Sequence, residues 1–131
     1  MYRIGWVGNS WPIFGPALLE QLHVQVDVEV KHYPGSRDLI ESELSGIDLL
    51  MIELQCWNPR LKSEIMSRLS KVMSGSSIPV VFLNTLGPLD SEEQGSLKDQ
   101  FPTMRAIVHV PAIPSELCST LKRVLEERGR H

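Results

Sequence analysis

Regular alternation between strand-like and helix-like segments is the feature that most constrains how this chain can fold. Short apolar segments rich in β-forming residues occupy residues 2–8, 26–33, 47–54, 78–83 and 105–110. Helices are predicted over residues 11–25, 36–46, 59–74, 90–100 and 114–128. The second rests on Ser36 as its N-cap and Gly46 at its end, and the fourth is weaker, more polar and interrupted by Gly95. Parallel strands need crossover connections, which are almost always right-handed. The alternation therefore predicts a parallel sheet with helices on both faces.

The composition of individual segments predicts where they lie in that sheet. Residues 47–54 (IDLLMIEL) are the most apolar, which is typical of the centre of a parallel sheet. Residues 26–33 (VDVEVKHY) alternate apolar and polar side chains, which predicts a half-exposed edge strand. Five strands of this kind predict a three-layer, flavodoxin-like α/β fold of strand order 2-1-3-4-5. Pro12 and Pro16 suit only a first helical turn or a preceding loop, so we expect the first helix to begin late.

Length and composition predict one soluble domain that spans residues 1–131. The chain is 42% apolar and 22% charged, which supports a folded core and excludes intrinsic disorder. The net charge of −3 argues against direct contact with nucleic acid. Cys56 and Cys118 have no metal-ligand spacing and are interpreted as reduced thiols. The N-terminus resembles a strand rather than a signal peptide, and no apolar run is long enough to span a membrane, so a cytoplasmic location is expected.

Candidate functional residues follow the predicted strands, because ligand sites in open parallel sheets lie at the carboxyl ends of the strands. The residues delivered to that edge are Gly8, Asn9, Ser10, Trp11, Glu53, Gln55, Cys56, Trp57, Asn84, Thr85, His109, Val110 and Pro111. Glu53 is the one carboxylate among them, whereas Mg²⁺ prefers several oxygen ligands. No glycine-rich nucleotide-binding motif follows the first strand. Neither a metal nor a cofactor is therefore expected.

A hydrolase is the alternative that these residues leave open. The run Gly8-Asn9-Ser10 is faintly similar to the Gly-Asp-Ser that opens the small SGNH esterases. The late Asp-x-x-His dyad of those enzymes has no counterpart in the last helix, although His109 is delivered to the same edge. A small flavodoxin-like hydrolase or ligand-binding module would use Asn9, Ser10, Glu53 and His109.

The element order and three local motifs resemble the receiver domain of bacterial two-component response regulators. Residues 47–53 (IDLLMIE) resemble the family's Pro-Asp-Leu-Val-Leu-Leu-Asp, whose last Asp accepts a phosphoryl group. Residues 78–84 (IPVVFLN) resemble its fourth strand, and Val110-Pro111 resembles its Lys-Pro. The resemblance covers essentially the whole chain as a pattern and implies a CheY-like fold.

None of the family's five functional positions keeps its residue type in this sequence. The acidic pair falls on Gly8 and Asn9, the acceptor Asp on Glu53, the switch Thr or Ser on Asn84, and the Lys on Val110. Phosphoryl transfer to a carboxylate needs Mg²⁺ and a cation that compensates the transferred charge. The resemblance therefore implies a degenerate, non-catalytic pseudo-receiver. Such a protein would contact another protein, a regulator, kinase or effector of a bacterial signalling or transcription pathway, independently of phosphorylation.

Two interpretations of Glu53 follow from this resemblance. Glu53 either imitates a phosphorylated Asp or is simply a solvated residue at a strand end. We favour the second, because exposed charges without responding partners contribute little. Trp11 and Trp57 flank the same edge and form a candidate interaction surface, although they also suit a lid over the sheet. Trp6, inside the first strand, is expected in the core.

A second candidate surface follows from the family's use of its fourth helix, fifth strand and fifth helix in dimerisation. In this chain the corresponding residues are 90–100, 105–110 and 114–128. Both helices carry mixed charges: Asp90, Glu92, Glu93, Lys98, Asp99, Lys122, Arg123, Glu126, Glu127 and Arg128. Such charges suit reciprocal pairs across a two-fold axis of a homodimer, and they equally suit a solvated helix face.

Overall fold

The predicted sheet order is confirmed in a computed structural model that describes residues 2–8, 11–33, 46–54, 59–84, 89–109 and 114–129. Five parallel strands form one sheet of order β2-β1-β3-β4-β5. The elements are β1 (Tyr2–Val7), α1 (Trp11–Gln25), β2 (Val28–Tyr33), β3 (Leu49–Leu54), α2 (Pro59–Met73), β4 (Val80–Asn84), α3 (Ser91–Gln100), β5 (Met104–His109) and α4 (Pro114–Gly129). The helix expected at residues 36–46 lies outside the described residues.

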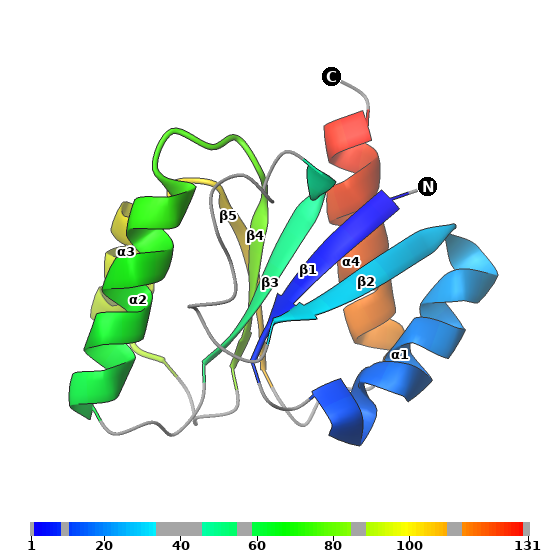
Figure 1. Cartoon of the computed structure of the whole chain (residues 1–131), viewed down its shortest axis with the longest axis horizontal. Coiled ribbons are helices and arrows are strands. Elements are labelled where there is room, and N and C mark those ends of the chain that lie inside the picture. Colours follow the sequence, from blue (N-terminus) through cyan, green and yellow to red (C-terminus); the bar gives the residue numbers. More distant parts are fainter. Residues whose placement is uncertain are drawn as a thin grey trace.

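Helices cover both faces of the sheet and enclose two hydrophobic cores (Figure 1). α2 and α3 pack on one face, and α1 and α4 on the other. Side chains of a strand alternate between the faces, so Leu50 and Ile52 of β3 enter the first core and Leu49 and Met51 the second. β3 is buried along its whole length, which confirms its predicted central place.

Helix α1 begins earlier than the prolines predicted. The expectation of a late start is wrong, because the helix begins at Trp11 and contains Pro16. Pro16 has no amide hydrogen to donate to the carbonyl four residues earlier. Leu18 and Leu22, one turn apart, are buried against the sheet, so tertiary packing holds the helix despite this missing bond. Within the described residues, no helix combines the length and hydropathy needed to span a bilayer.

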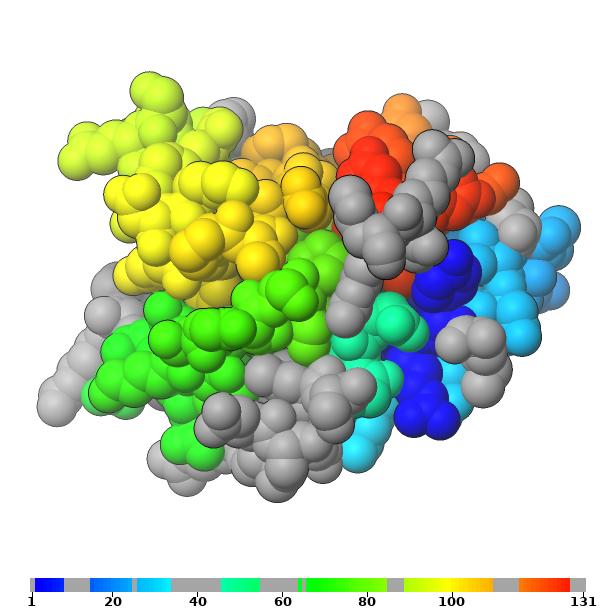
Figure 2. Space-filling model, turned by 90° about the horizontal axis from the view of Figure 1, so that it is seen from above, coloured from blue at the N-terminus to red at the C-terminus, as the bar shows by residue number. Residues whose placement is uncertain are grey.

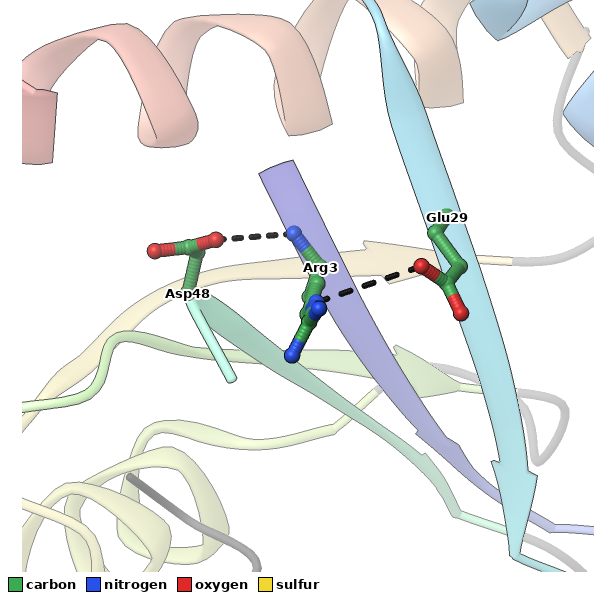
Figure 3. A network of polar contacts seen from close by, with 3 residues as sticks. All are labelled: Arg3, Glu29 and Asp48. Atoms are coloured by element: carbon green, nitrogen blue, oxygen red, sulfur yellow. Dashed lines mark hydrogen bonds and ion pairs between the residues drawn. The ribbon is translucent and has the colours of Figure 1, made fainter. Parts of the chain in front are cut away.

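Polar contacts fix the start of β1 against its two neighbouring strands (Figure 3). Asp48 Oδ2 accepts the backbone N–H of Arg3 at 2.8 Å, and the backbone N–H of Asp48 donates to the Arg3 carbonyl at 2.7 Å. The Arg3 side chain reaches toward β2, where Nε lies 3.9 Å from Glu29 Oε2. Both side chains of that ion pair are more than half exposed, so the Asp48 contacts hold the register more strongly.

Replacing Asp48 is therefore expected to cost more stability than replacing Glu29. Asp48→Ala removes a charge-assisted acceptor and should lower the free energy of unfolding by about 1–2 kcal/mol. Glu29→Ala removes one exposed ion pair and should change it by less than about 0.5 kcal/mol. Urea unfolding followed by circular dichroism measures both, and equal costs would contradict this account.

Candidate functional site

The carboxyl ends of β1, β3, β4 and β5 meet at one edge of the sheet, as predicted. The structure describes four of the predicted site residues there: Gly8, Glu53, Asn84 and His109. The predictions for Asn9, Ser10, Gln55, Cys56, Trp57, Thr85, Val110 and Pro111 lie outside the described residues. Trp11 begins α1, but its side chain also lies outside them. The candidate interaction surface of Trp11 and Trp57 therefore stays a prediction.

Glu53 is buried, with 0% of its surface exposed. The interpretation of Glu53 as a solvated strand-end residue is therefore wrong. Its Oε2 accepts the indole N–H of Trp6 at 2.9 Å, and Trp6 is itself 1% exposed. Trp6 thus lies in the core as predicted, but it has a polar role that the sequence analysis missed.

The pleat of the sheet explains why Glu53 turns inward. Glu53 shares a face of β3 with Leu49 and Met51, the face that packs against α1 and α4. Trp6 is on the same face of β1, where it lies opposite Met51 in the register. The Glu53 side chain therefore reaches sideways from β3 to β1. Asp would be one methylene shorter at this position, so the longer residue is the one that reaches the indole.

Gly8 provides the space that the Glu53 carboxyl group occupies. A Cβ atom built on Gly8 would lie 1.8 Å from Glu53 Oε2, far inside van der Waals contact. The φ angle of Gly8 is +148°, a conformation that residues with a side chain rarely adopt. A side chain at position 8, including a carboxylate, is therefore incompatible with this placement of Glu53.

The edge strand β2 holds the backbone of Gly8 in place. The backbone N–H of Gly8 donates to the Tyr33 carbonyl at 3.0 Å. The Gly8 carbonyl contacts His32 Nε2, also from β2. With Nε2 as the donor of this hydrogen bond, His32 satisfies the carbonyl of Gly8, the residue that follows β1. Gly8 is thus fixed by β2 on one side and covered by Glu53 on the other.

The remaining pair at this edge joins β4 to β5. Asn84 is 2% exposed, and its amide nitrogen Nδ2 lies 3.0 Å from Nδ1 of His109. The amide donates, so Nδ1 accepts and the imidazole proton sits on Nε2. His109 is exposed, in keeping with a residue at the end of an edge strand. Asn84 occupies the predicted switch position, and here it orients a histidine.

No group of three His, Cys, Asp or Glu side chains within the described ranges is arranged to hold a metal ion. The hydrolase alternative has only two of its four residues in those ranges. Glu53 is hydrogen-bonded to Trp6 and His109 to Asn84, so each bonds to a different neighbour. Cys118 lies in the second core, where burial raises the pKa of its thiol, and its Sγ donates to the Leu18 carbonyl at 3.7 Å. Cys118 is thus an unreactive packing residue.

Comparison with solved structures identifies the fold. No protein-family model and no curated protein matches this sequence. A response regulator receiver domain from Clostridium thermocellum is 14% identical, covers 98% of both chains and superimposes with a TM-score of 0.70. A CheY-like receiver domain protein from Methanospirillum hungatei is 15% identical over 99% of this chain and 98% of its own, also with a TM-score of 0.70. A response regulator from Desulfuromonas acetoxidans is 20% identical over 96% and 98%, with a TM-score of 0.68. The fold is that of a response regulator receiver domain.

The receiver fold confirms the architecture implied by the sequence resemblance. The edge at which Gly8, Glu53, Asn84 and His109 meet is where that resemblance places the phosphorylation site. At this edge the described residues form a closed arrangement: Glu53 is buried on Trp6, and its carboxyl group fills the space over Gly8.

Adding a methyl group at Gly8 tests this arrangement. Gly8→Ala should lower the free energy of unfolding by about 3 kcal/mol, because strained backbone and overlap with Glu53 act together. Gly75→Ala is the matched control, since Gly75 also has a positive φ of +80° but has open space around its Cβ position. Combining Gly8→Ala with Glu53→Ala should cost less than the sum of the two single changes. Strict additivity in urea unfolding would show that the two residues do not compete for space.

A double-mutant cycle measures the hydrogen bond between Trp6 and Glu53. Trp6→Phe leaves a buried carboxylate without its indole donor, whereas Glu53→Met removes the carboxylate itself. We expect the cost of Trp6→Phe to be lower in the Glu53→Met background by about 1.5–3 kcal/mol. Because Trp6→Phe loses the same volume in both backgrounds, the difference isolates the polar contact. A coupling below about 0.5 kcal/mol would contradict it.

Proposed function

We propose that this protein is a non-catalytic pseudo-receiver that acts in signalling through phosphorylation-independent contact with another protein. The observation that carries the proposal is the burial of Glu53, the residue at the acceptor position, against Trp6. A phosphoryl acceptor has to meet its donor in line, which requires an accessible carboxylate. A carboxylate with no exposed surface, already bonded to an indole, cannot be approached in this way.

The packing around Gly8 supports the same conclusion from the side of the metal ligands. Mg²⁺ in a phosphoryl-transfer site needs several oxygen ligands, and the resemblance assigns two of them to positions 8 and 9. Position 8 has no side chain, and the Glu53 carboxyl group fills the space that one would need. Restoring an acidic residue there would displace Glu53. The loss of the metal site and the inward turn of Glu53 are thus two consequences of one arrangement.

Burial also argues against Glu53 as a mimic of a phosphorylated Asp. A mimic has to present its charge to partners that respond to it, whereas Glu53 directs its carboxylate into the core. We therefore infer that the surface of the fold, rather than charge at this site, transmits the signal. Candidate contact surfaces are the Trp11 and Trp57 edge and the face of α3, β5 and α4. The partner would be a regulator, kinase or effector in the bacterial cytoplasm.

The test follows the fluorescence of Trp6 as Mg²⁺ and then beryllofluoride, an analogue of the acyl phosphate, are added. Trp11→Phe and Trp57→Phe leave Trp6 as the single tryptophan, and its indole lies on the candidate acceptor. We expect no saturable change, because the acceptor is closed to the analogue. Urea unfolding of the same variant is the positive control, because it shows that the Trp6 fluorescence changes when the surroundings of the indole change. Intact mass after incubation with acetyl phosphate gives a second readout, expected to be unchanged.

Glu53→Asp provides the matched control for this experiment. It restores the residue type of the family's acceptor but leaves Gly8 and Asn9 without carboxylates, so it too is expected to stay unmodified. Saturable, Mg²⁺-dependent binding of beryllofluoride to the parent protein would overturn the proposal. Ester hydrolysis by the parent protein, lost in Ser10→Ala, would favour the hydrolase alternative instead.

A further inference from the structure

Two histidines form hydrogen bonds at the carboxyl edge of the sheet, and they use their ring nitrogens in opposite ways. His32 of β2 contacts the carbonyl oxygen of Gly8 through Nε2, which has to be the donor because a carbonyl only accepts. His109 of β5 lies with Nδ1 3.0 Å from Nδ2 of Asn84, and here the ring nitrogen is the acceptor because the amide nitrogen only donates. The first contact therefore needs a proton on the ring nitrogen, whereas the second needs a nitrogen without one.

Protonation of the imidazole rings affects the two contacts differently. The imidazolium ion carries a hydrogen on both ring nitrogens. His32 keeps its bond to Gly8, because its Nε2 donates in both forms. His109 gains a hydrogen on Nδ1, which then points at the NH2 group of Asn84, so two donors face each other. Histidine ordinarily takes up this proton near about pH 6.5, so the Asn84 contact is present in neutral solution and is lost as the pH falls.

Burial prevents Asn84 from adapting easily to a protonated His109. Asn84 is 2% exposed, although it is the last residue of β4. Turning its amide over would bring the oxygen atom to His109, but it would also put the NH2 group where the oxygen now lies. In a buried site, a donor placed at an acceptor's position costs stability. The contact therefore opens rather than reverses.

His109 itself is open to protons from the solvent. Its side chain is exposed, and its ring has no further hydrogen bond and no ion pair within the described part of the chain. A proton therefore acts on an exposed group whose bonding partner is buried. This is the arrangement through which a change outside the molecule reaches a side chain that solvent does not contact.

The charged residues of the surrounding elements do not engage His109. β5 lies between α3, in yellow, and α4, in orange to red, in both views of the molecule (Figures 1 and 2). Glu53, the carboxylate at the same edge, is on the other face of the sheet and is bonded to Trp6. β4 carries no titratable residue. The described charged residues of β5, α4, α3 and its N-cap, none of which forms an ion pair with His109, are Asp90, Glu92, Glu93, Lys98, Asp99, Arg105, Glu116, Lys122, Arg123, Glu126 and Glu127.

We propose that Asn84 and His109 form a proton-sensitive clamp between the ends of β4 and β5, closed while His109 is neutral and open once it is protonated. The two residues are register partners and the last residues of adjacent strands. The chain continues from them toward α3 and α4, so opening loosens the ends of both strands. The input is a proton, which needs neither Mg²⁺ nor a phosphoryl donor. The inference goes beyond the proposed function, because it holds whether or not Glu53 accepts a phosphoryl group.

Nuclear magnetic resonance of the ¹⁵N-labelled full chain between about pH 8 and about pH 5 tests the clamp. At the upper pH the His109 ring should carry its proton on Nε2 alone. As the pH falls, the side-chain NH2 signals of Asn84 should move together with the ring signals of His109. The hydrogen-exchange protection factor of the Asn84 backbone amide should fall about fivefold, the effect of losing one ordinary hydrogen bond.

Three single variants separate the clamp from other effects of pH. Asn84→Asp replaces the donor by a carboxylate that accepts from the protonated ring, so protection at position 84 should rise rather than fall as the pH is lowered. His109→Gln keeps a side-chain acceptor that does not titrate, so its Asn84 signals should be constant over the same range. His32→Gln removes the other histidine of this edge and keeps a donor for Gly8, so the Asn84 response should remain as in the parent protein.

Circular dichroism at both ends of the pH range checks that each variant is folded. Asn84 signals that do not follow the protonation of His109 would overturn the proposal, as would a response that His109→Gln retains. Equal responses of the parent protein and Asn84→Asp would also contradict it. A response that disappears in His32→Gln would place the proton sensitivity on β2 instead. These measurements contain neither Mg²⁺ nor beryllofluoride, so their outcome is independent of the fluorescence test of Glu53.

Discussion

The buried contact between Trp6 and Glu53 is the constraint on which the rest of the functional edge depends. It joins the two strands between which an open parallel sheet reverses its order, where such folds place their ligand sites. The carboxyl group of Glu53 crosses from β3 to β1, so the residue that follows β1 has to be a glycine. One side chain thus determines the residue at position 8, the absence of an exposed carboxylate from β3 and the polar role of a core tryptophan.

The solved structures show that the fold of this chain is that of a receiver domain, whereas the loss of phosphoryl chemistry is our proposal. The solved receiver structures share only 14–20% identity with this chain, yet they superimpose over nearly its whole length. Such a fold needs a pattern of apolar residues rather than particular side chains, so β3 and β4 stay buried while their ends change. Function depends on the residues at those ends, so the shared fold does not by itself assign the function of this chain.

The pairing of α2 with α3 illustrates a second property of layered α/β folds. In a parallel sheet each helix follows the strand before it in the chain. Two helices of unrelated composition therefore become neighbours on one face because the strand order places their strands side by side. α2 and α3 are consecutive and follow adjacent strands, so they become neighbours on one face.

The sequence by itself determined the number and order of the strands, the central place of β3 and the parallel topology. Hydrophobic periodicity marks each element locally, and the rules for crossover connections leave few ways to join such elements. It did not determine where α1 begins, because the packing of Leu18 and Leu22 outweighs the local preference of Pro16. It placed Gly8, Glu53 and Asn84 at one edge, because the ends of parallel strands meet there, and the family resemblance alone marked them as altered positions. Only the tertiary structure decided that Glu53 turns inward. The direction of a side chain at a strand end depends on its register with the neighbouring strand. Here the register of β3 with β1 places the Trp6 indole within reach of Glu53. Periodicity along β3 alone carries no information about the Trp6 indole on β1.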